Sequence, residues 1–175
     1  IRDLVDMHSE TANEMYASDL SVGYRFGALN AEFDFTKNVI NAHGVRYINV
    51  GDAAITPEHG DVTIRLKAEM DELKHSRILA GRDNKYHELY NCNTKIKTVT
   101  RFYANGYYDY VDADKNVQTL YFDTVYYVTK ETFGESKIPL EKNFQFSDQF
   151  GFDGRAELHS TQPFLSYFGG VEIRT

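Results

Sequence analysis

Strict alternation of apolar and polar residues most limits what this chain can fold into. In residues 62–70, an apolar residue occupies every second position, with polar or charged residues between them. Successive side chains of a strand point to opposite faces, so this pattern predicts a half-buried strand rather than a helix. The same alternation covers residues 20–28 and then changes parity. A bulge or tight reversal is therefore expected at residues 27–30.

The second half of the chain predicts an antiparallel meander. Asn105 and Gly106 both tolerate a positive φ, so the pair predicts a type I′ hairpin turn. A second turn is expected at residues 112–116, followed by a strand over 117–129. The polar stretch 71–87 predicts a loop. Residues 138–175, in which Phe stands among Gly, Ser, Asp and Gln, are expected to anchor a loop or to form edge strands.

Residues 1–17 depart from the period of two. Their apolar residues recur at three- and four-residue spacings, which predicts an amphipathic helix. The expected fold is therefore α+β and mainly antiparallel β, with an N-terminal helix packed on a curved antiparallel sheet. An all-β sandwich is the alternative. The length of 175 residues suits a single domain, with the helix over 1–17, the sheet over 20–129 and an aromatic-rich C-terminal segment over 138–175.

Composition excludes several classes of function. The net charge of −7 argues against nucleic-acid binding, which needs basic residues to replace phosphate counterions. No run of 18 apolar residues occurs, so no transmembrane segment is expected. The one cysteine, Cys92, cannot form an intramolecular disulfide or a cysteine-based metal cluster.

Two motifs match metal-binding patterns in part. Asp112, Asp114 and Asn116 stand at the alternate positions of a calcium loop, but Val117 replaces the glycine that such a loop needs for its sharp turn. His87 begins a zinc-protease pattern whose second histidine is absent. The first motif is interpreted as a polar hairpin turn and the second as a polar surface group, and neither a metal site nor a cofactor is expected.

An acid/base pocket is the alternative functional hypothesis. A helix on a curved sheet can enclose a cavity for a small apolar substrate, and an Asp or His there can move a proton. The candidates, if their side chains converge, are His43, Asp34, Asp123 and Tyr103. The protein would then be a cofactor-free lyase or isomerase.

Tyrosines crowd the predicted meander and lead to the main hypothesis. A tyrosine ring packs while its hydroxyl still bonds outward, so Tyr suits a wet interface, and alternation places about half of these rings away from the core. We expect a non-catalytic binding or structural protein, with a partner protein, a second copy or a glycan on the sheet surface or an edge strand. Because Ile1 is not Met, a processed extracellular or particle subunit is considered. The candidate binding residues are Tyr103, Tyr107, Tyr108, Tyr110, Tyr121, Tyr126 and Tyr127.

Overall fold

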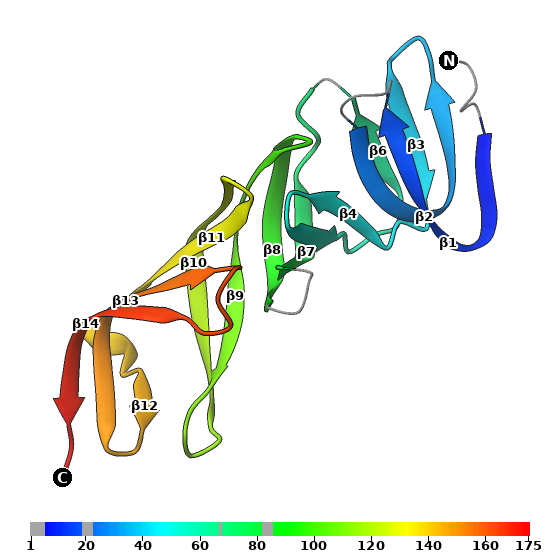
Figure 1. Ribbon diagram of the computed structural model, residues 1–175. Helices are drawn as coiled ribbons and strands as arrows, with labels where there is room; N and C mark the ends of the chain where they lie inside the picture. Colours follow the sequence, from blue (N-terminus) through cyan, green and yellow to red (C-terminus); the bar gives the residue numbers. More distant parts are fainter. Residues whose placement is uncertain (1–5, 19–22, 67, 82–85) are drawn as a thin grey trace.

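The computed structural model describes residues 6–18, 23–66, 68–81 and 86–175, and these form one antiparallel sheet of 14 strands (Figure 1). The strands are β1 (Asp6–Ser18), β2 (Gly23–Asp34), β3 (Val39–His43), β4 (Tyr47–Val50), β5 (Ala53–Thr56), β6 (Val62–Arg65), β7 (Leu73–Ala80), β8 (His87–Thr98), β9 (Arg101–Val111), β10 (Val117–Val128), β11 (Glu131–Ile138), β12 (Gln145–Ser147), β13 (Phe150–His159) and β14 (Ser166–Ile173).

The strand order makes the molecule long. It runs β12-β13-β11-β10-β9-β8-β7-β5-β4-β2-β3-β6, while β1 pairs with β2 and β14 pairs with β13 off this path. Strands β1, β2, β3 and β6 gather at one end, and β12, β13 and β14 at the other (Figure 1). The helical element of the described chain is a single 3-10 turn, Leu140–Lys142. No helix among the described residues is long and apolar enough to cross a membrane.

The predicted α+β class is wrong, and so is the N-terminal helix within the described residues. Asp6–Ser18 forms β1, which pairs antiparallel with β2, and residues 1–5 of the predicted helix lie outside the described residues. The register of this pair shifts between His8 and Asn13. Such a shift breaks a strict period of two, so a strand can show the three- and four-residue spacings of a helix. The sandwich alternative does not hold either, because the strands form one sheet.

Of the bulge or tight reversal expected at residues 27–30, the reversal does not form, but an irregular pairing is present there. Strand β2 continues through these residues, and its pairing with β1 shifts register there: His8 lies opposite Asn30, and Asn13 lies opposite Ala28. The partner of β2 on its other side changes at the same place, from β4 at Gly27 to β3 at Asn30.

The hairpin expected at Asn105–Gly106 does not form. Both residues lie inside β9, and the turn into this strand falls at residues 99–100. A Cβ atom at Gly106 would lie 2.3 Å from Cys92 Sγ, so glycine is needed there for close packing between β8 and β9. The turn at 112–116 and the strand after it are confirmed, with β10 covering Val117–Val128.

Two neighbouring predictions are wrong, and a buried polar residue explains the second of them. The strand expected over 62–70 ends at Arg65, and the loop expected over 71–87 contains β7. A polar residue, Ser76, occupies a core position of β7, where its hydroxyl lies 2.8 Å from Thr94 Oγ1 and donates to Cys92 O at 2.9 Å. Buried polar residues with bonded partners are invisible to a hydrophobicity pattern.

One hydrophobic core runs along the sheet because its central part curls. In the β4–β5 turn, the Asp52 carboxylate accepts bonds from Thr132 N at 3.1 Å, from Thr132 Oγ1 at 2.6 Å, and from the Ser160 hydroxyl. His87 Nε2 at the start of β8 lies 2.6 Å from Gln162 O, beyond β13. These contacts join strands that are not neighbours in the sheet, so one face is enclosed and its opposite remains open.

Candidate functional site

Alternation in β9 separates its tyrosines onto two faces. Phe102 is fully buried and Tyr108 and Tyr110 pack against the core, whereas Tyr103 and Tyr107 occupy the intervening positions. Residues two apart in a strand share a face, so these two lie on the side away from the core. We call this side, across β8, β9, β10, β11 and β13, the outer face.

Three tyrosines form a row across the outer face, one from each of β8, β9 and β10. Tyr107 lies directly opposite Tyr90 on one side and Tyr121 on the other. The ring centroids are 6.0 Å apart for Tyr90–Tyr107 and 5.1 Å apart for Tyr107–Tyr121. Opposed cross-strand side chains are close enough for their rings to touch, which explains the row. It is called the Tyr107 row below.

A second row crosses four strands nearer the other end of β9. Tyr126 lies opposite both Tyr103 and Phe133, and Phe133 lies opposite His159. Successive centroids are separated by 6.1, 5.5 and 5.0 Å. This Tyr126 row and the Tyr107 row together make up the outer aromatic face.

The Tyr107 row is fixed by a carboxylate at its edge. The Tyr90 hydroxyl donates to Asp109 Oδ1 at 2.7 Å, and the Thr119 hydroxyl donates to the same oxygen at 3.2 Å. The bond to the Asp109 carboxylate holds the phenol proton and raises the pKa of Tyr90. Tyr121, at the far end of the row, is 43% exposed. The row therefore has a ring fixed by a hydrogen bond at one end, Tyr90, and a solvent-exposed ring at the other, Tyr121.

Charged groups flank the Tyr126 row. Lys97 Nζ lies 5.9 Å from the ring centroid of Tyr103, which is 47% exposed. Lys97 bonds to Glu69, and Lys95 Nζ lies 3.2 Å from the same carboxylate. Hydrogen bonds from the two lysines lower the pKa of Glu69, and the bond from Lys97 has the larger effect. At the far end of the row, His159 Nδ1 lies 3.0 Å from Glu131 Oε1.

The structure divides the seven tyrosines proposed for binding. Tyr103, Tyr107, Tyr121 and Tyr126 lie on the outer aromatic face. Tyr108, Tyr110 and Tyr127 pack against the core instead. Tyr90, Phe133 and His159 belong to the outer aromatic face but were missed, because alternation assigns faces and only the register assigns neighbours.

On the core side, aromatic rings form a closed cluster at the β12–β14 end. Tyr110 lies 5.0 Å from Phe144 between ring centroids, and Phe146 lies 4.8 Å from Tyr167. Phe152 also joins it, 5.5 Å from Tyr167. Burial raises the pKa of Tyr110 and of Tyr167, because the charged phenolate would lose its hydration.

The four acid/base candidates are not brought together. His43 and Asp34 belong to β3 and β2, while Tyr103 and Asp123 belong to β9 and β10, at least five strands away along the sheet order. Asp34 Oδ1 accepts from Thr36 N at 3.0 Å and so caps a turn. His43 Nδ1 lies 3.0 Å from Asp61 on the exposed surface.

The partial metal motifs are structural in the folded chain. Asp112 is buried, and its Oδ1 accepts from Asp114 N at 2.9 Å and from Asn116 N at 2.8 Å, which closes the hairpin turn. His87 is buried too, and burial lowers its pKa. Among the described residues, no group of three His, Cys, Asp or Glu side chains could hold a metal ion.

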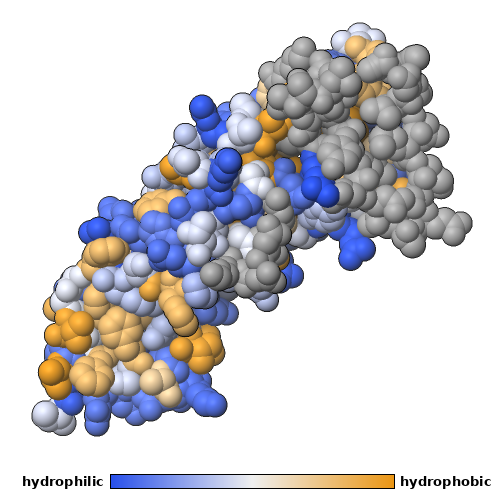
Figure 2. All heavy atoms as spheres, viewed as in Figure 1, coloured by the Kyte–Doolittle hydropathy of each residue, from blue (hydrophilic) through white to orange (hydrophobic). Residues whose placement is uncertain are grey.

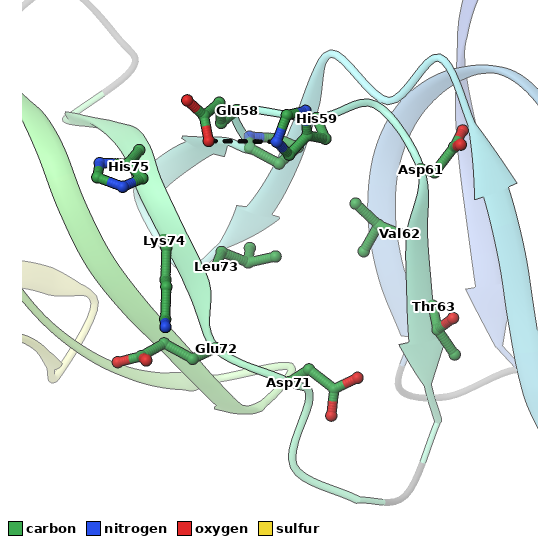
Figure 3. A pocket seen from close by; sticks show the side chains of 11 residues that line it. Glu58, His59, Asp61, Val62, Thr63, Asp71, Glu72, Leu73, Lys74 and His75 are labelled. Carbon is green, nitrogen blue, oxygen red and sulfur yellow. Dashed lines mark ion pairs between the residues drawn. The ribbon is translucent and has the colours of Figure 1, made fainter.

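A pocket of about 440 Å³ lies between β6 and the segment that enters β7 (Figure 3). Val62 and Leu73 face each other across it, while Asp61 and Thr63 point away (Figure 3). Glu58 and His59 form an ion pair at 3.3 Å, and Asp71 pairs with Arg65 at 3.2 Å. The charged residues that line the pocket, Glu72 and Lys74 included, are exposed to solvent, so the pocket does not enclose a shielded acid or base. The outer aromatic face is therefore the stronger candidate site.

Comparison with known proteins gives no relative from which the role of the site could be inferred. No protein-family model, curated protein or solved structure matches this chain.

Proposed function

We propose that this chain is a non-catalytic binding protein whose outer aromatic face holds a neutral glycan chain. The observation that carries the proposal is the pair of aromatic rows on one open face of the sheet, opposite the face that packs the core. Rings in each row stand 5.0–6.1 Å apart between centroids. Tyrosine suits such a surface because its ring supplies rigid apolar area and its hydroxyl bonds to water or ligand.

Sugar chemistry matches both parts of this face. A pyranose ring has an apolar face of C–H groups that stacks on an aromatic ring, and hydroxyls around its edge that need polar partners. Asp109 and Thr119 stand at the Tyr107 row and supply a carboxylate and a hydroxyl. A chain of linked sugars could therefore follow a row of rings from strand to strand.

The residues between the rows favour a glycan over a protein partner. These outer positions carry the polar or charged side chains Asn93, Asn105 and Asp123, and Lys95 lies opposite Tyr103 at the end of the Tyr126 row. The centres of protein–protein interfaces are depleted in Lys and Asp and enriched in apolar side chains. The net charge of −7 disfavours an anionic glycan, so the proposed ligand is neutral.

The alternative hypothesis of a lyase or isomerase finds less support. It requires His43, Asp34, Asp123 and Tyr103 to converge, and the strand order separates them into two pairs. A shared proton transfer needs groups within hydrogen-bond reach of one substrate.

The test is a calorimetric titration of the protein with cellohexaose, xylohexaose and N-acetylchitohexaose in turn. The double variant Tyr107→Ala/Tyr121→Ala should weaken the binding of the preferred oligosaccharide by at least about tenfold, which is about 1.4 kcal/mol. Tyr86→Ala is the matched control, because Tyr86 is exposed but lies outside both rows. Its affinity should equal that of the wild type.

Two results would contradict the proposal. One is that no oligosaccharide binds the wild type. The other is that the double variant binds as well as the control does. A fall in solution mass caused by Tyr107→Ala/Tyr121→Ala alone would instead identify the outer aromatic face as a contact between copies.

A further inference from the structure

Strand β14 is an edge strand without the usual protection. Among the described strands it pairs only with β13, and it runs for eight residues, Ser166–Ile173. It contains no Lys, Arg or Pro, and its one charged residue is Glu172. Exposed strand edges in stable proteins are normally kept short, charged or interrupted by proline, since their free N–H and C=O groups recruit another strand.

The other edge strands with described side chains differ in these respects. Strand β6 has four residues and ends at Arg65, which pairs with Asp71. Strand β12 has three residues. Among the described strands, β1 also has a single partner, β2, and is longer, with 13 residues, but its sequence contains three acids, Asp6, Glu10 and Glu14. Low charge over a long edge therefore distinguishes β14.

Apolar side chains are exposed along β14. Val171 is 59% exposed and Ile173 is 72% exposed. Phe150, which lies opposite Ile173 in β13, and Phe168 are exposed as well. Apolar residues gather over the end of the molecule that carries β12, β13 and β14 (Figure 2). A free strand edge and an apolar surface thus coincide.

We propose that β14 pairs antiparallel with β14 of a second copy of this chain, so that the two sheets become continuous. A two-fold axis through Gly170 or Val171 would bring Val171 and Ile173 of each copy onto the partner strand. Glu172 would then lie opposite Phe168 or Gly170, so no like charges would meet. Gly169 and Gly170 carry no side chains that could shield the middle of this edge.

Local charge favours a second copy despite the net charge of −7. Near the proposed axis and at the end of β14, the charged residues are two acids and two bases: Asp153, Glu172, Arg155 and Arg174. A third acid, Glu157, lies farther along β13, opposite Ser166, and is paired with Arg155 and His159. The contact region is therefore neutral, and identical surfaces can approach without repulsion. This contact is separate from the outer aromatic face.

Light scattering of the full chain across a dilution series tests the pairing. The wild type should have the mass of a dimer that dissociates on dilution. The double variant Val171→Lys/Ile173→Lys should be monomeric at every concentration, because two lysines per copy would meet across the edge. Val117→Lys is the matched control, since Val117 is 62% exposed in β10. It and Tyr107→Ala/Tyr121→Ala should remain dimeric.

Cysteine crosslinking tests the register. The natural Cys92 is buried, and burial raises the pKa of its thiol to about 12, so it contributes little background. Gly170→Cys or Val171→Cys should form a disulfide-linked dimer under mild oxidation, and Val117→Cys should not. A monomeric wild type, a dimer that survives Val171→Lys/Ile173→Lys, or no crosslink at either β14 position would each overturn the proposal.

Discussion

Tyr107 and Tyr108 are consecutive residues of β9, yet they lie in different surroundings. Tyr107 stands between two other tyrosines on the outer face. Tyr108 points to the core, where its ring meets Phe122 edge-on with centroids 5.9 Å apart. Burial raises the pKa of Tyr108. The same residue type therefore holds the fold together on one face and is available to a ligand on the other.

The largest change in the free energy of unfolding should come from an aromatic residue on the core side of the sheet. Phe144 is fully buried in the aromatic cluster with Tyr110 and Tyr167. Phe144→Ala should lower the free energy of unfolding by about 3–5 kcal/mol, through lost burial and the cavity left behind. Urea denaturation measures this loss. Phe164→Ala, at an exposed position, should change the free energy by less than about 0.5 kcal/mol.

Gly106 tests how tightly the core face of β9 is packed. A Cβ atom there would overlap Cys92 Sγ, so Gly106→Ala should cost about 1–3 kcal/mol in the free energy of unfolding. The double variant Gly106→Ala/Cys92→Ala should be more stable than Gly106→Ala alone, because the shorter side chain leaves room. Equal stability of the two variants would show that the overlap is not the cause.

A smaller effect is expected on the outer side. Tyr107→Ala removes the ring contacts with Tyr90 and Tyr121 and should lower the free energy of unfolding by about 1 kcal/mol. Thermal unfolding beside Phe144→Ala gives the comparison directly. A loss as large as that of Phe144→Ala would mean that the outer aromatic face is part of the folding core.

A pH-dependent effect should be confined to mildly acidic conditions. Burial lowers the pKa of His87, against opposing bonds to the backbone of Gln162 and His159, so the unfolded chain binds its proton more readily than the folded chain. The contribution of His87 is therefore complete above about pH 6.5, its unfolded pKa, and is lost as the pH falls towards the lower folded pKa.

The groups facing His87 are the Tyr108 hydroxyl, 3.5 Å from its Nδ1, and the His159 charge. Denaturation of wild type and His87→Gln between pH 5 and pH 7.5 isolates the effect. The wild type should lose more stability on acidification than the variant. Parallel curves would contradict the assignment to His87.

Sequence alternation predicted strand β10 and the separation of the tyrosines onto two faces. It assigned residues 117–129 to a strand, observed as Val117–Val128, and residues 112–116 to a turn, because the apolar positions of the strand are regular and the turn residues are polar. It failed where long-range pairing decides the structure. Asp6–Ser18 is a strand because β2 pairs with it, and a register shift hides its period.

The membership of the aromatic rows could not be predicted from one sequence. Tyr90, Phe133 and His159 join the outer aromatic face through the register of β8, β11 and β13 with their neighbours. Local sequence assigns a side chain to a face but does not choose the opposite residue. The hairpin signal at Asn105–Gly106 misled for a similar reason, because the need for glycine comes from Cys92 on the neighbouring strand.

The most direct test is nuclear magnetic resonance of the protein with its 13 tyrosine rings labelled, titrated with the preferred neutral oligosaccharide. We predict that the signals of Tyr90, Tyr103, Tyr107, Tyr121 and Tyr126 shift with ligand concentration. The signals of Tyr108, Tyr110 and Tyr167 should stay in place. Shifts confined to the core-side tyrosines, or no shift in any ring, would contradict a glycan site on the outer aromatic face.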